Sequence, residues 1–206
     1  MKTLFPAMTL AGLCACGPLE VRIDETRGVP AVTGSTTVTL ANYTCGQPLT
    51  SSGFTVTTTV VTGGCQFSFD QDVQVITAAD YQSIPELKGA TNLVQRVELT
   101  VKKLALSDGA TGAALDLNTR VTSATLSVNA QQLADKASLS SLPRVVVLSG
   151  ASLTALKAQI DARQPASVHA TVVVVIPDSP KPPDTLKIDY DAQPAVIVGP
   201  GTISLP

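Results

Sequence analysis

The chain has 206 residues, of which 14 are basic and 16 acidic, and 44% are hydrophobic. This is the composition of a folded protein with a real core rather than of a disordered chain. The nearly balanced charge offers no basic field, so we expect no nucleic-acid partner. Aromatic residues make up 3% of the chain and Trp is absent, which weakens a sugar-binding interpretation.

The N-terminus has the three parts of an export signal. Lys2 supplies a positive charge, an apolar stretch runs from Leu4 to Leu13, and the small residue Ala15 stands before Cys16. About ten residues at about 1.5 Å each cannot cross a hydrocarbon core of about 30 Å. The stretch is therefore not expected to remain as a membrane span.

Leu13, Ala15 and Cys16 resemble the lipobox of bacterial lipoproteins, in which a Leu stands three residues before the Cys and a small residue directly before it. The resemblance implies cleavage before Cys16, a diacylglycerol on its thiol and usually an acyl chain on its new amine. Residues 1–15 are then a lipoprotein signal peptide. By the same resemblance, Gly17 after the Cys suggests the outer membrane of a Gram-negative bacterium.

Two other interpretations of this segment remain. Cys14 could carry the lipid, but bulky Leu13 would then stand directly before it, which fits the lipobox less well. The segment could also be an ordinary cleaved export signal followed by a free Cys16.

We expect residues 16–206 to form one domain, because no internal repeat or convincing linker interrupts them. A split near residues 89–92 is the alternative, since the second part alone has enough predicted strands for a small sandwich. A strand is predicted directly after the anchor, where Leu19, Val21 and Ile23 alternate with charged residues. The domain is therefore expected to sit close to its membrane.

Segments rich in Val, Thr and Ser, separated by turn residues, predict further short strands. They are 36–41, 54–62, 65–77, 93–106, 114–117, 121–129, 144–148, 168–176, 186–191, 195–198 and 202–205. The pair Gly63-Gly64 predicts a hairpin turn with positive φ at both glycines. A slip in the apolar alternation at Lys102-Lys103 predicts a β-bulge, with an anion site at the two lysines as the weaker alternative.

One helix is predicted at 152–163, because its apolar residues recur at helical spacing, Ser152 can cap it and Pro165 stops it. Single helical turns are expected near 78–81 and 130–136. Many short strands with one helix predict a mainly β fold, an antiparallel β-sandwich of immunoglobulin-like or jelly-roll type.

Cys45 and Cys65 are the only cysteines left once Cys14 is removed and Cys16 is acylated. Two thiols in an exported chain pair by default, so we expect a disulfide. A loop of about 20 residues gives a stabilisation of roughly 3 kcal/mol in the chain-entropy model. Two thiols without a nearby His would leave zinc short of ligands.

His169 is the only His, so any Ser-His-Asp or Cys-His mechanism would have to use it. Its strand position predicts a partly exposed surface residue, and no Gly-x-Ser-x-Gly elbow accompanies it. Two carboxylate pairs, Asp70 with Asp72 and Asp189 with Asp191, share strand faces as a glycosidase pair could, although such spacing is common on solvated strands.

Four further carboxylates could offer oxygen ligands for calcium, but no Asp-x-Asp-x-Asp-Gly loop holds them. They are Asp108, Asp116, Asp178 and Asp184. No phosphate-cradling loop and no His/Cys cluster with metal spacing occurs in the sequence. We therefore expect no catalytic residue, no cofactor and no metal.

The sequence favours a noncatalytic lipoprotein, held to the membrane through Cys16, that presents its sandwich to a protein partner in the envelope. The alternative is a carrier of a small apolar molecule. The reason for this alternative is a valine-rich interior with few large side chains, which could leave a cavity. The helix at 152–163 or the Pro-rich loop at 177–184 could cover that cavity. An unrecognised hydrolase is a distant third hypothesis.

Overall fold

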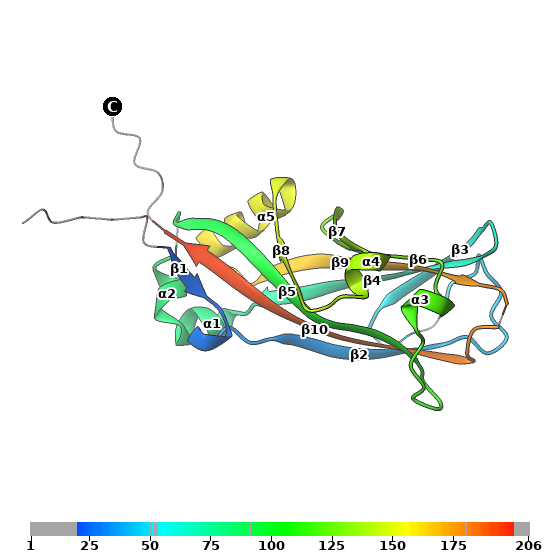
Figure 1. The fold of residues 1–206 in the computed structure, drawn as a ribbon. Helices are drawn as coiled ribbons and strands as arrows, with labels where there is room; N and C mark the ends of the chain where they lie inside the picture. Colours follow the sequence, from blue (N-terminus) through cyan, green and yellow to red (C-terminus); the bar gives the residue numbers. More distant parts are fainter. Residues whose placement is uncertain (1–19, 50, 52, 91, 180, 200–206) are drawn as a thin grey trace, which may run out of the picture.

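The computed structural model describes residues 20–49, 51, 53–90, 92–179 and 181–199, which form two packed antiparallel sheets (Figure 1). The first sheet has β10 at its centre, with β5 and then β8 on one side and both β2 and β1 on the other. Its strands are β1 (Val21–Ile23), β2 (Val32–Thr39), β5 (Val94–Asp108), β8 (Arg144–Val147) and β10 (Thr185–Val198). The second sheet has, in spatial order, β3 (Thr55–Val61), β4 (Gly64–Ile76), β9 (Ala166–Pro177), β6 (Ser123–Val128) and β7 (Gln131–Asp135). The expected mainly β sandwich is confirmed.

The core lies between the sheets because alternate residues of each strand turn inward. In β4, Phe67 and Phe69 are fully buried, whereas the intervening Ser68 is only partly covered. Strands from both halves of the chain build both sheets: β4 pairs with β9, and β2 pairs with β10. Pairing therefore joins the segments on either side of residues 89–92.

Short helices close the ends and edges of the sandwich. They are the 3-10 turn η1 (Glu25–Arg27) and the helices α1 (Ala78–Ser83), α2 (Pro85–Lys88), α3 (Leu117–Arg120), α4 (Lys136–Leu139) and α5 (Gly150–Asp161). Thr77 caps α1 through a reciprocal capping box with Asp80. None of the helices in the described part of the chain is long and apolar enough to cross a membrane.

The predicted helix at 152–163 is confirmed as α5, but its start and its cap differ from the prediction. Ser149 is the N-cap residue, and its side chain makes no capping bond. Ser152 lies inside the helix, is buried, and donates to the carbonyl oxygens of Val128 and Asn129. Its hydroxyl thus ties the helix to the end of β6 instead of capping it.

Segment 130–136 is mainly a strand, so the predicted helical turn there is wrong. Asn129 and Ala130, both with positive φ, form a two-residue turn that joins β6 to β7. Segment 114–117 likewise makes only an isolated bridge, from Ala114 to Ser107, in place of the predicted strand.

β10 is one strand of 14 residues and not the two predicted at 186–191 and 195–198. Pro194 lies opposite Leu99 of β5. On its other side it falls between the end of β2, which pairs up to Ala192, and the start of β1, which pairs from Val196. Pro194 lacks an N–H group, and it is tolerated in that gap because no neighbouring strand there needs a hydrogen bond from this position. The predicted strand at 202–205 lies outside the described residues.

The β-bulge predicted at Lys102-Lys103 is confirmed. Lys103 lies opposite Asp191, whereas Ala192 pairs with Val101, so Lys102 is the extra residue in β5. The bulge brings both lysine side chains onto the outer face of the sheet, where Lys102 pairs with Glu25 at 3.0 Å.

The hairpin predicted at Gly63-Gly64 exists, but its turn lies one residue earlier. Val61 pairs with Gly64, so the two loop residues are Thr62 and Gly63, and only Gly63 has positive φ (+80°). Gly64 is required for a different reason. A Cβ at this position would stand 2.4 Å from the carbonyl oxygen of Ile176 on the neighbouring strand.

Candidate functional site

Cys45 and Cys65 form the expected disulfide. Cys65 opens β4, and the bond fastens to it the loop that connects the two sheets. Tyr43 in the same loop packs its ring 5.6 Å from that of Phe67. The Cys45–Cys65 disulfide therefore has a structural role at one end of the sandwich. The predicted lipid-bearing Cys16 and signal peptide lie outside the described residues.

His169 stands on the outer face of the second sheet, directly opposite Asp72 of β4. Its Nδ1 lies 2.9 Å from Asp72 Oδ1, and its Nε2 lies 3.5 Å from Asp70 Oδ1. The imidazole is 51% exposed. The structure thus brings together the single His and one of the two carboxylate pairs singled out in the sequence.

The two carboxylates raise the pKa of His169 above its ordinary value of 6.5, chiefly through the hydrogen bond with Asp72. Asp70 is held in turn by the hydroxyls of Thr171, at 2.7 Å, and Ser68, at 3.1 Å. These bonds orient the carboxylate toward the ring. The cluster can offer a charged donor at mildly acidic pH and carboxylate acceptors beside it.

A groove of about 500 Å³ runs between this cluster and α5. Its wall combines apolar surface with five polar side chains, those of Asp72, Asn129, Gln159, Ser167 and His169. Several are fixed by bonds to the backbone, since Asn129 Oδ1 accepts the N–H of His169 at 2.7 Å and Gln159 Oε1 accepts that of Ser167 at 3.2 Å. The groove is therefore a surface of mixed polar and apolar character in which Asn129 and Gln159 are held in place.

Among the described residues, the ring nitrogens of His169 contact Asp72 and Asp70, and no hydroxyl or thiol bonds to them. The hydroxyl of Ser152, which also lines the groove, is directed to the carbonyl oxygens of β6. In the part of the chain that the structure covers, no group of three or more His, Cys, Asp or Glu residues has the geometry of a metal site.

The second predicted carboxylate pair, Asp189 and Asp191, lies in the first sheet, and its described ion pairs are with lysines of that sheet. Asp189 and Asp191 share the outer face of β10 as expected, and Asp189 pairs with Lys187 at 3.1 Å and Lys103 at 3.6 Å. A bond from the Ser35 hydroxyl, followed by the bond from Lys187, holds the pKa of Asp189 below its usual value.

Three of the four carboxylates considered for calcium are engaged in local bonds. Asp108 accepts the N–H of Ala110 at 2.8 Å, Asp116 accepts that of Asn118 at 2.9 Å, and Asp184 pairs with Lys181. Each of these bonds fixes a turn or a loop, as Asp side chains commonly do.

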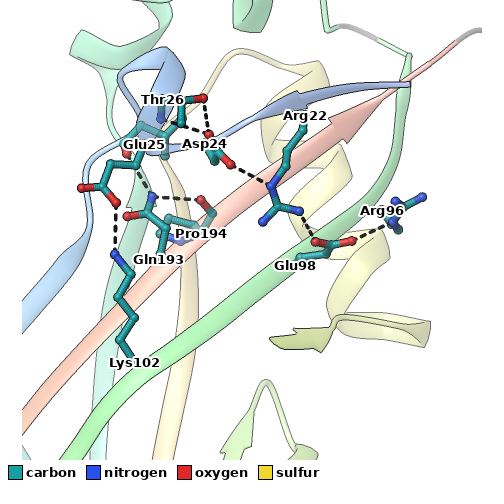
Figure 2. Close-up of polar contacts among 10 residues, drawn as sticks. Arg22, Asp24, Glu25, Thr26, Arg96, Glu98, Lys102, Gln193 and Pro194 are labelled. Atoms are coloured by element: carbon teal, nitrogen blue, oxygen red, sulfur yellow. Dashed lines mark hydrogen bonds and ion pairs between the residues drawn. The ribbon is translucent and has the colours of Figure 1, made fainter. Parts of the chain in front are cut away.

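An ion-pair network that sequence reasoning missed lies where β1 meets the sheet (Figure 2). Glu98 of β5 accepts bonds from the guanidinium groups of Arg96, at 2.9 Å, and of Arg22. Arg22 also pairs with Asp24 at 2.7 Å, and Arg96 with Glu20 at 2.8 Å. The Glu98 side chain is only 11% exposed, and the bond from Arg96, followed by that from Arg22, lowers its pKa.

The network covers apolar residues on the outer face of the first sheet. Ile197 lies between Arg22 on one strand and Arg96 on the other, and Ala195 lies beside Glu98. Both apolar residues are buried although no second sheet covers that face. The aliphatic parts of the charged side chains thus shield the apolar surface while their ends pair.

The apolar cavity between the sheets has a volume of about 50 Å³. Its wall includes Phe54 and Tyr190, whose rings meet edge to face, together with Val172 and Ile188. An apolar cavity that binds a benzene-sized ligand measures about 150 Å³. This cavity is too small for such a ligand, so it gives no support to the small-molecule carrier hypothesis.

No protein-family model matches the chain, and comparisons with curated proteins and with solved structures found no significant match.

Proposed function

We propose that this protein is a lipid-anchored lipoprotein of the bacterial envelope whose β-sandwich is a noncatalytic module for contact with another protein. The observation that carries the proposal is the short distance in sequence between Cys16 and the first strand of the fold. β1 begins at Val21, five positions after Cys16, and pairs at once with Val198 on the central strand β10. A domain built in this way is held at the membrane and has little freedom to sample distant partners.

The outer faces of the sandwich support a binding role. The groove beside α5 presents fixed donors and acceptors, and the paired His169 and Asp72 stand at its wall. Such a surface suits the backbone and polar side chains of a protein partner. The net charge of −2 and the absence of Trp argue against nucleic acid and favour protein over sugar.

The state of His169 supports a noncatalytic assignment over a hydrolase. Its ring faces two carboxylates, and the hydroxyl of Ser152 in the same groove is committed to backbone carbonyls. A Ser-His-Asp mechanism needs a hydroxyl bonded to the free ring nitrogen.

The anchor is tested by metabolic labelling with an alkyne fatty acid in a bacterial host, comparing the wild type with Cys16→Ser. Label and outer-membrane location that disappear in Cys16→Ser are the expected result. Label that persists in the variant, or a soluble unlabelled wild type, would refute the lipid anchor.

The contact surface is tested in the same cells with a photo-crosslinking residue placed at Ala155, which is exposed and lines the groove. Thr37, exposed on the outer face of the first sheet, is the matched control position. A discrete adduct from position 155 and none from position 37 is expected. The absence of any reproducible adduct at position 155 would count against a partner at this groove.

A further inference from the structure

Three strands end together at the side of the sandwich where the chain enters. Val21 of β1 pairs with Val198 of β10, and Val198 pairs with Val94 of β5. The residues just beyond these pairs, Glu20 and Leu93, therefore lie at the same end. We call it the anchor end, and Figure 1 shows the β3–β4 hairpin at the opposite end of the molecule.

Leu93 is an exposed leucine on a well-fixed turn at the anchor end. Its side chain is 40% exposed. Its N–H donates to the carbonyl of Ala90 at 2.8 Å, and its own carbonyl accepts the N–H of Gly199 at 3.0 Å. The preceding N–H, of Asn92, donates to Asp161 at 2.7 Å. The backbone thus holds an apolar side chain outward, which is unfavourable in water.

Basic residues belong to the two segments that hold the Leu93 turn, through the bonds of Ala90 and Asp161. Lys88 and Arg163 are both exposed, and the Arg163 guanidinium donates to the Lys88 carbonyl at 3.0 Å. The same strand end carries Arg96, which pairs with Glu20. An exposed apolar residue at an end of the fold that also carries the exposed Lys88 and Arg163 fits the headgroup layer of a bilayer that contains anionic lipid.

The chain length places this end at the membrane. Four residue steps separate Cys16 from Glu20 and span at most about 14 Å when fully extended. Glu20 and Leu93 lie two strands apart, a distance of about 10 Å. A lipid on Cys16 would therefore keep Leu93 within reach of the same bilayer surface.

We propose that the anchor end rests on the lipid bilayer, with Leu93 inserted in the headgroup region and Lys88 and Arg163 beside lipid phosphates. The β3–β4 hairpin then points away from the membrane. This inference rests on the proposed lipid anchor at Cys16. It deepens the proposed function by fixing which surfaces remain free for a protein partner.

The chain has no Trp, so a single introduced Trp is a specific fluorescent probe. Leu93→Trp reports on the anchor end. Val60→Trp is the matched control, because Val60 is 69% exposed in β3, next to the hairpin turn at the opposite end. Both positions are exposed, so both variants are expected to fold, as checked by circular dichroism and by an intact Cys45–Cys65 bond.

The acylated variants are purified and reconstituted on vesicles of phosphatidylethanolamine and phosphatidylglycerol whose acyl chains are brominated. Emission of Leu93→Trp is expected to fall by about half or more, because bromine quenches a Trp at the headgroup boundary about 5–10 Å deep. Emission of Val60→Trp is expected to stay unchanged. Unquenched Leu93→Trp, or equal quenching of the two variants, would overturn the inference.

Mass spectrometry of the N-terminal peptide and flotation of the vesicles separate the two levels of the proposal. Acylated protein that floats with vesicles but shows no quenching at position 93 refutes only the membrane contact. Protein without the acyl mass refutes the lipid anchor, and the membrane contact falls with it.

Discussion

Arg22 and Glu98 are 76 positions apart in the sequence and form an ion pair that fastens the first strand to β5 across the end of β10. β1 has only three residues, so its backbone hydrogen bonds to β10 alone would hold it weakly. The ion pair and the neighbouring bond from Arg96 to Glu98 therefore help to determine where the N-terminal segment joins the fold.

Glu98→Gln should destabilise the protein. The variant keeps the shape of the side chain but removes the charge that two guanidinium groups face. Bonds to charged groups contribute about 1.5–3 kcal/mol each, and the partly exposed arginines lower this, so we expect a loss of about 1–2 kcal/mol in the free energy of unfolding. Urea unfolding measures it. Glu20→Gln, in an exposed pair with Arg96, is the control and should change stability by less than about 0.5 kcal/mol.

The effect of Glu98→Gln should depend on pH. The pKa of Glu98 is lowered below its ordinary value of 4.5, first by the bond from Arg96. A lowered pKa means that the stabilisation is present above pH 4.5 and is lost as the pH falls through the lower folded value. Urea midpoints of wild type and variant should therefore differ at pH 7 and converge in strong acid. A difference that stays constant down to low pH would show that the charge of Glu98 is not its source.

His169 should titrate above its ordinary pKa of 6.5, and Asp72 should be the main cause. A raised pKa gives stabilisation that is fully present below about pH 6.5 and is lost as the pH rises through the folded value. NMR titration of the imidazole measures the shift directly. Asp72→Asn should return the pKa toward 6.5, and Asp70→Asn should change it less, because Asp70 lies farther from the ring. A larger effect of Asp70→Asn would contradict this geometry.

The parts of the fold that depend on local pattern could be predicted from the sequence. Alternation with a period of two gives the strands, and its slip at Lys102 gives the bulge, because an extra residue reverses the faces. The disulfide followed by elimination, since the predicted processing leaves only Cys45 and Cys65.

The candidate sites depend on contacts between distant segments, which local pattern does not encode. His169 meets Asp72 across 97 positions, and Arg22 meets Glu98 across 76. The turn at Asn129 and Ala130 was missed for another reason. Ala has no intrinsic preference for positive φ, so the composition of segment 130–136 predicts a helical turn and gives no sign of the hairpin turn.

Removing the disulfide with the double variant Cys45→Ser/Cys65→Ser should lower the free energy of unfolding by about 3 kcal/mol, because the unfolded chain then regains the freedom of a 20-residue loop. Urea unfolding under oxidising conditions gives the difference. Addition of reductant should destabilise the wild type by a similar amount and leave the variant unchanged. A variant as stable as the wild type would show that the loop is held by its other contacts, such as that of Tyr43 with Phe67.

Gly64→Ala should destabilise the sandwich more than Gly63→Ala, although the two glycines are neighbours. A Cβ at Gly64 would meet the backbone oxygen of Ile176 at 2.4 Å, and that oxygen belongs to β9, the middle strand of the second sheet, whose backbone cannot move cheaply. Overpacking of this kind costs about 1–3 kcal/mol. A Cβ at Gly63 would meet open space, so Gly63→Ala carries only the strain of its positive φ, about 1 kcal/mol. Urea midpoints of the two variants decide the matter, and a larger loss in Gly63→Ala would show that the turn, and not the close approach of β4 to β9, requires glycine here.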